Sequence, residues 1–142
     1  MPLKFHPEPG TVLICDFDSG FREPEMVKRR PVVVISPRLK RRTGLVSVVP
    51  LSTTPPDPIE DYHCEVRMEP PLPKPFDSPT AWVKADMLYT VGFQRLELVR
   101  TGRDQYGKRK YLTPVLAPAE LARIQHCVLV ALGLSGLTKR SE

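Results

Sequence analysis

Cysteine is scarce in this chain, and its spacing excludes two classes of small protein. The 142 residues hold three cysteines, Cys15, Cys64 and Cys127, which lie far apart and form no Cys-x-x-Cys pair. An odd number at wide spacing is not the framework of a disulfide-rich secreted domain, and the missing pair argues against a zinc site. We therefore expect three buried, unreactive thiols, and neither a metal ion nor any other cofactor.

Long hydrophobic runs are also missing. The longest apolar stretch, around residues 128–134, is interrupted by Gly133 and is far shorter than the roughly 20 residues that cross a bilayer. The first residues do not form the pattern of a signal peptide. We expect a cytoplasmic protein without membrane contact, built as one domain with a core over about residues 9–134, an N-terminal arm (1–8) and a C-terminal tail (135–142).

Acidic residues are missing from the segment between Lys28 and Arg42, which carries seven cations. A second basic group lies between Arg95 and Lys110, and acidic residues gather between the two groups. The net charge is +5. Two basic groups suggest a polyanionic partner, because phosphates are attracted without regard to sequence, although two solvated loops would give the same pattern.

Short apolar segments between turns predict a mainly β protein. We expect strands at residues 11–17, 31–36, 45–51, 62–68 and 80–89. The Val/Ile run at 32–35 is typical of a strand buried on both faces, whereas 62–68 alternates and should expose one face, with His63 on it. Pro118 should begin a helix that ends at Gly133. Together these elements predict a small, strongly bent β-barrel with one C-terminal helix.

Several blocks of residues together resemble a known family. A strand ending in Asp16-Phe17 and a long loop precede the block Arg30-Pro31-Val32-Val33-Val34-Ile35-Ser36, and Val48-Val49-Pro50-Leu51-Ser52-Thr53-Thr54 follows it. Ala81-Trp82-Val83-Lys84-Ala85-Asp86 and the helix end Leu132-Gly133-Leu134 come later. In these blocks the chain resembles the MazF/PemK toxins of type II toxin–antitoxin systems, over about residues 9–134.

This resemblance implies an SH3-like barrel of the MazF/PemK/CcdB type and a homodimer with an RNA groove at its interface. It implies a metal-independent endoribonuclease, an mRNA interferase that cleaves single-stranded RNA by attack of the 2′-hydroxyl and leaves a 2′,3′-cyclic phosphate. A cognate antitoxin would neutralise it. The alternative is a non-catalytic binding protein on the same fold, either gyrase-poison-like or RNA-binding.

The resemblance also assigns catalytic residues. Arg30 matches the family's catalytic arginine, and its permanent charge and forked donors suit a phosphate. Ser52 falls on the catalytic threonine position, with Thr53 as the alternative. Either hydroxyl could instead cap the turn before Pro55.

Two further positions match groups that could move protons. Lys84 and Asp86 match the family's Arg-x-Asp pair, and residues two apart in a strand share a face. They could equally form a surface ion pair of little energetic value. Glu23 lies in the first loop, where family members carry a Gly-x-Glu signature, and is a candidate base.

The remaining expectations concern RNA contacts away from the reacting bond. Cations beside Arg30 and in the next loop would follow the RNA backbone, and Phe21 would stack on a base unless it only packs within its loop. These cations are Lys28, Arg29, Arg38, Lys40, Arg41 and Arg42. Trp82 is expected in the core, with a stacking platform for a base as the alternative.

Overall fold

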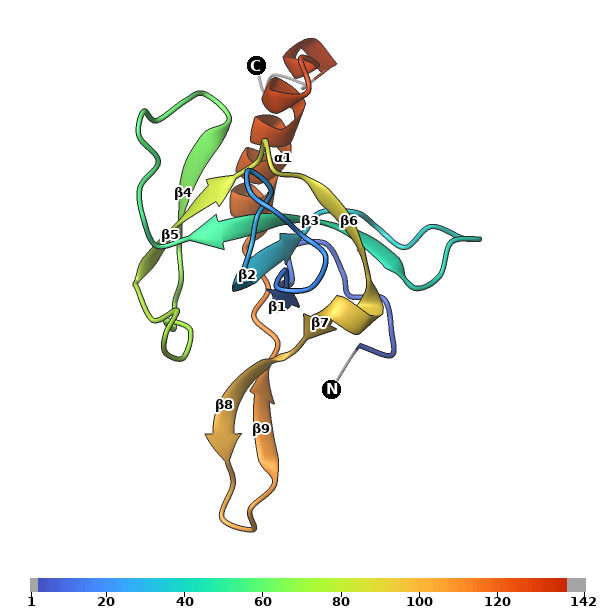
Figure 1. Ribbon diagram of the computed structural model, residues 1–142, viewed down its shortest axis with the longest axis vertical. Coiled ribbons are helices and arrows are strands. Elements are labelled where there is room, and N and C mark those ends of the chain that lie inside the picture. The colour runs from blue at the N-terminus through green and yellow to red at the C-terminus, as the bar shows by residue number, and fades with distance from the viewer. Residues whose placement is uncertain (1–2, 138–142) are drawn as a thin grey trace.

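The computed structural model describes residues 3–137, which form one bent antiparallel sheet, a separate two-stranded hairpin and one long helix (Figure 1). The sheet contains β1 (Val12–Asp16), β2 (Arg29–Val34), β3 (Leu45–Ser52), β4 (His63–Arg67), β5 (Thr80–Lys84), β6 (Tyr89–Gly92) and β7 (Leu96–Glu97). The hairpin is β8 (Val99–Arg103) with β9 (Arg109–Leu112), and the helix is α1 (Pro118–Ala131). Short 3-10 helices occupy Phe93–Arg95 and Ser135–Leu137. The prediction of a mainly β fold with a C-terminal helix is confirmed.

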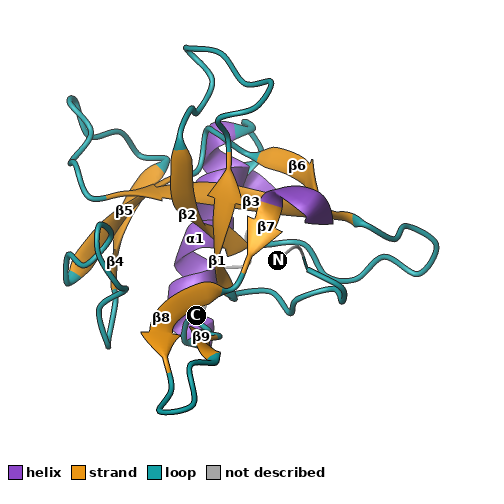
Figure 2. Ribbon diagram, turned by 60° about the horizontal axis from the view of Figure 1, so that its bottom comes forward, coloured by secondary structure: helices purple, strands orange, loops and turns teal. Residues whose placement is uncertain are grey.

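The long strand β3 organises the sheet, whose strand order is β4-β5-β3-β2-β1-β7. Its first residues pair with β6, its middle with β2, and its last two residues with β5. Figure 2 shows β3 running across the whole sheet, from β6 at one side to β5 at the other. Because one strand serves three neighbours, the sheet has to bend along β3.

Alternate residues of β2 face two separate cores. Val33 packs with Leu51 and Ile124 in one cluster, whereas Val32 packs with Phe17 and Leu96 in the other. None of these side chains is more than 2% exposed. The valine run therefore forms a strand that is buried on both faces, as its sequence predicted.

The helix α1 covers the face of the sheet that carries Val33. It begins at Pro118, a residue suited to the first turn, and the chain turns away at Gly133, where φ is +75°. Ile124 enters the core, and the guanidinium of Arg123 donates to the carbonyl of Glu65 at 3.0 Å, which ties the helix to β4. In the described part of the chain, neither α1 nor either 3-10 helix has the length and apolarity needed to span a bilayer.

One sequence prediction about the strands was wrong, and one hairpin was missed. The expected strand over residues 80–89 is two strands, because a turn closed by the Met87 amide and the Lys84 carbonyl separates β5 from β6. The hairpin β8–β9 was not predicted. Its residues are almost all polar and exposed, so no apolar alternation marks it.

Two of the three cysteines are buried. Burial raises the pKa of Cys15 to about 12, which suits the inert thiol that was expected. Cys64 is only half-buried and shares a hydrogen bond with Cys127, which raises the pKa of Cys64 and lowers that of Cys127. The expectation of burial was therefore wrong for Cys64.

Candidate active site

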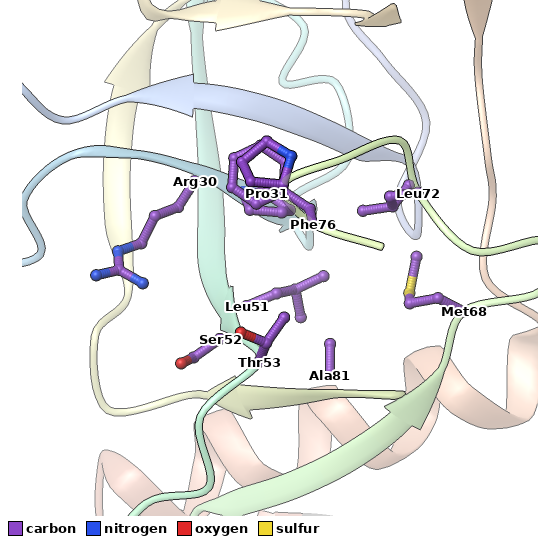
Figure 3. A pocket seen from close by; sticks show the side chains of 10 residues that line it. Arg30, Pro31, Leu51, Ser52, Thr53, Met68, Leu72, Phe76 and Ala81 are labelled. Atoms are coloured by element: carbon purple, nitrogen blue, oxygen red, sulfur yellow. The ribbon is translucent and has the colours of Figure 1, made fainter. Parts of the chain in front are cut away.

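The antiparallel pairing of β2 and β3 brings the predicted arginine and hydroxyls together. Val32 pairs with Pro50, so continuing the register places Arg30 opposite Ser52. Arg30, Ser52 and Thr53 line one hollow of about 140 Å³, here called the Arg30 hollow. Figure 3 shows the guanidinium and both hydroxyls at one end of it, and Met68 and Leu72 at the other.

Arg30 is held at its inner nitrogen and open at its outer ones. Its Nε donates to the carbonyl oxygen of Val27 at 3.1 Å, which fixes the plane of the guanidinium. Within the described part of the chain, its two terminal amino groups make no hydrogen bond. The side chain is half-buried, so these donors face the solvent beside the hydroxyls. This arrangement suits a group with two acceptor oxygens, such as a phosphate.

Ser52 and Thr53 differ in what their hydroxyls already bind. Ser52 is 5% exposed, and its Oγ accepts the Thr54 amide at 3.1 Å and donates to the Thr54 carbonyl at 3.3 Å. This is the turn-capping role that the sequence left open. Thr53 is exposed, and its hydroxyl has no partner among residues 3–137. The geometry therefore favours Thr53 as the hydroxyl that can meet a ligand.

The face of the sheet that carries Arg30 and Ser52 continues across two more strands. Ser52 pairs with Trp82 of β5, and Trp82 pairs with Glu65 of β4. Arg30, Ser52, Trp82 and Glu65 therefore form one row across four strands. Trp82 is half-buried and belongs to neither hydrophobic cluster, contrary to the expectation that it is a core residue. Sequence reasoning preferred the core for this position because the alternation of β5 does not say which face the core covers.

Lys84 and Asp86 were predicted to share a strand face, but they do not. Lys84 ends β5, whereas Asp86 lies in the following turn. Lys84 is diagonal to Ser52 across the β3–β5 pair, a position that lies about 7–8 Å away in such a ladder.

Asp86 faces His63 of β4 instead. Its Oδ1 lies 4.0 Å from His63 Nε2, and His63 Nδ1 accepts the Glu60 amide at 2.9 Å. The neutral imidazole therefore carries its proton on Nε2, toward the carboxylate. The side chain of His63 is only 8% exposed, so the prediction that it lies on an exposed face was wrong.

The loop between β1 and β2 holds two further candidates, Glu23 and Phe21, and neither lines the Arg30 hollow. Glu23 is exposed. The ring of Phe21 is 5.1 Å from that of Phe17 and 5.3 Å from that of Tyr89, and the guanidinium of Arg95 lies 4.7 Å over it. Phe21 thus packs within its loop, which was the alternative to stacking on a base.

The two cations before Arg30 differ in their freedom. Lys28 is exposed and has a left-handed backbone, with φ +73°. Arg29 forms an ion pair with Glu97, and this contact lowers the pKa of Glu97. Lys28 is thus the freer of the two.

The basic tip of the first hairpin lies away from the Arg30 hollow. It joins the end of β2 to the start of β3, whereas Arg30 and Ser52 are at the opposite ends of these strands (Figure 1). At about 3.3 Å per residue, the strand lengths from Arg30 to Val34 and from Leu45 to Ser52 give separations of roughly 13 Å and 23 Å. The cations concerned are Arg38, Lys40, Arg41 and Arg42, and their contact with RNA stays a prediction. Among residues 3–137, no three His, Cys, Asp or Glu side chains gather as they would around a metal ion.

Comparison with known proteins gives two relatives over nearly the whole chain. A protein of Haemophilus influenzae is 31% identical over 151 residues, which cover 96% of this chain and 98% of that protein. YifN of Escherichia coli is 30% identical over 155 residues, which cover 96% of this chain and 99% of YifN.

Solved structures share the fold at lower identity. MazF from Deinococcus radiodurans superposes with a TM-score of 0.57 at 20% identity, covering 92% of this chain and 99% of that one. The MazE–MazF structure from the same organism gives a TM-score of 0.55 at 20% identity, covering 93% of this chain and 100% of the matched chain. Residues 8–132 match the sequence pattern of the PemK-like, MazF-like toxin of type II toxin–antitoxin systems.

Proposed function

The chain belongs to the PemK-like, MazF-like toxins of type II toxin–antitoxin systems, and we propose that it is an endoribonuclease that cleaves single-stranded RNA without a metal ion. The observation that carries this proposal is the shared hollow of Arg30, Ser52 and Thr53. A fixed guanidinium and a free hydroxyl there point at the same small volume. A protein that only binds RNA has no need of both groups around one phosphate.

The reaction begins with attack of a ribose 2′-hydroxyl on the neighbouring phosphorus. The new P–O2′ bond forms as the P–O5′ bond breaks, which gives a 2′,3′-cyclic phosphate and a 5′-hydroxyl. The outer nitrogens of Arg30 and the hydroxyl of Thr53 donate to the non-bridging oxygens, where negative charge develops. DNA is not a substrate because it lacks the 2′-hydroxyl.

Two proton transfers accompany this displacement. A base takes the proton of the 2′-hydroxyl, and an acid protonates the leaving 5′-oxygen. Asp86 and Glu23 are the carboxylates offered for the first step. Lys84, diagonal to Ser52, is offered for the second. Trp82, in the same row as Ser52, supplies an aromatic face on which a neighbouring base can stack.

Partners follow from the same family. MazF of Deinococcus radiodurans has been crystallised with MazE. By analogy, a cognate antitoxin neutralises this chain, with an acidic segment that orders itself over the basic site. The protein acts as a homodimer in the cytoplasm.

The test replaces Arg30 with alanine and with lysine. Arg30→Ala should abolish cleavage of a long single-stranded RNA, while Tm changes little because the side chain sits at the rim of the core. Arg30→Lys should retain a trace of cleavage activity, since the positive charge remains but the forked donors of the guanidinium are absent. The products should carry 2′,3′-cyclic phosphates, seen as resistance to 3′ ligation.

Three outcomes would contradict the proposal. Full cleavage by Arg30→Ala would remove the residue from the mechanism. Loss of cleavage in excess chelator, restored by magnesium, would indicate a metal-dependent reaction. If the wild-type protein bound RNA without cleaving it, the alternative of a non-catalytic binding protein would be correct.

A further inference from the structure

The hairpin β8–β9 projects from the body of the protein and is not part of the main sheet (Figure 1). Between Val99 and Leu112 the sequence has five cations and one acid, Asp104. The Oδ1 of Asp104 accepts the amides of Tyr106 at 2.8 Å and Lys108 at 2.9 Å, so this carboxylate is engaged in the turn. One carboxylate cannot balance five cations, so the hairpin keeps a large excess of positive charge.

The pairing of the two strands adds to the unbalanced charge. Arg103 lies directly opposite Arg109, and Arg100 lies opposite Tyr111. Like charges directly opposite one another destabilise a ladder, and a two-stranded hairpin is only marginally stable to begin with. An anion bound between these side chains would remove the repulsion.

A hollow lies where this hairpin meets the sheet. Six residues line its volume of about 290 Å³, here called the hairpin hollow: Arg29, Glu97, Leu98, Arg100, Arg109 and Tyr111. Arg29 and Glu97 form an ion pair, so their charges offset each other. Arg100 and Arg109 make no side-chain hydrogen bond or ion pair with the described residues. The hollow therefore has two guanidinium groups free to bind an anion.

We propose that the hairpin hollow binds a backbone phosphate of the RNA substrate outside the scissile linkage, with Tyr111 stacking on a neighbouring base. This inference rests on the proposed nuclease function. Arg29 belongs to the hairpin hollow and Arg30 to the Arg30 hollow, and the two residues are consecutive in β2. Because consecutive strand residues point to opposite faces, the two hollows lie on either side of the start of β2, and an RNA strand that passes around this strand end can reach both.

Tyrosines between the cations favour RNA over an acidic peptide. Tyr111 is 41% exposed and Tyr106 is 80% exposed, both among arginines and lysines. Cations that follow a phosphate backbone, with aromatic faces for the bases, are the common means of binding single strands. An acidic peptide would need the cations alone.

The test measures binding apart from cleavage. The ligand is a long single-stranded RNA whose 2′-hydroxyls are replaced by fluorine, so that it cannot be cut. The double variant Arg100→Ala/Arg109→Ala should raise its Kd roughly tenfold or more at low salt. Removing each phosphate-binding cation should also flatten the salt dependence, by roughly 0.7 in the slope of log K against log salt for a single strand.

Two control variants separate a site from bulk charge. Lys4→Ala/Lys74→Ala removes the same charge from two exposed positions outside both hollows and should leave Kd within about twofold. Arg100→Lys/Arg109→Lys should restore most of the affinity. Wild-type affinity in the alanine pair, or an equal loss in the Lys4/Lys74 pair, would overturn the proposal.

A measurement on the wild-type protein removes any doubt about folding of the variants. Amide hydrogen exchange across β8 and β9 should slow when the fluorinated RNA is added, and unchanged exchange would overturn the proposal. Natural RNA tests the nuclease function separately. If RNA binding depends on the hairpin arginines but natural RNA is not cleaved, the nuclease function is refuted and this binding site stands. If natural RNA is cleaved but binding does not depend on the hairpin arginines, the nuclease function stands and this binding site is refuted.

Discussion

At the residue scale, two adjacent hydroxyls at the end of β3 have different surroundings. The hydroxyl of Ser52 is buried in the turn and bound to both polar atoms of the Thr54 backbone, whereas that of Thr53 faces the Arg30 hollow. A hydroxyl that caps a turn contributes to stability, and one that faces the developing charge contributes to catalysis. The family match points to Ser52, but the hydrogen bonds point to Thr53.

Substitution of Thr53 should therefore affect catalysis, whereas substitution of Ser52 should affect stability. Thr53→Val should lower kcat about a hundredfold, as loss of one donor to a developing oxyanion does, and leave Tm nearly unchanged. Ser52→Ala should lower the free energy of unfolding by about 1 kcal/mol, because the Thr54 amide loses its acceptor, and keep most of kcat. Kinetics on RNA and thermal melting of both variants provide the check. A fall in kcat for Ser52→Ala alone would reverse the assignment.

At the element scale, the face of β5 that carries Trp82 continues the surface beside Ser52. Trp82→Ala should raise the Kd for RNA between about fivefold and a hundredfold, the range for loss of one stacked base. Its Tm should change little, since Trp82 packs in neither core. Trp82→Phe, which keeps an aromatic face, serves as the matched control and should recover most of the affinity. A large drop in Tm with unchanged Kd would show that the ring has a packing role instead.

The strands also show which parts of the fold could be predicted from the sequence. The run at Val32–Ile35 and the prolines around it predicted β2 and its pairing with β3, because a continuous β-branched run has few other uses. Burial on both faces also gave Arg30 a fixed position at the strand's start. The turn at Asp86 was missed because Ala85 and Met87 keep the segment apolar, although the turn and the pairing of β6 with β3 divide it.

Side-chain hydrogen bonds were beyond sequence reasoning for a different reason. The spacing of Ser52, Thr53 and Thr54 does not say which hydroxyl turns inward, since this depends on the path of the loop after β3. The burial of His63 likewise depends on Asp86 and Glu60, which approach it from separate loops. Interactions of this kind arise from the tertiary arrangement.

At the scale of the whole molecule, the site depends on a strand held between two cores. Val32 and Val33 are both 0% exposed, yet they belong to different clusters, one inside the bend of the sheet and one beneath α1. Arg30 therefore stands at the end of a strand that is buried on both sides. Such an anchor keeps the guanidinium in place without a ligand.

This arrangement predicts that the two cores contribute separately to stability. Val32→Ala and Val33→Ala should each lower the free energy of unfolding by about 2 kcal/mol, through reduced burial and a residual cavity. The double variant should lose close to the sum, with a coupling of less than about 0.5 kcal/mol, because the two side chains pack in different clusters. Val115→Ala, at a position 49% exposed, is the matched control and should change stability by no more than about 0.5 kcal/mol. Denaturant unfolding of the wild type and these variants measures the values, and strong coupling between the valines would mean that the cores act as one.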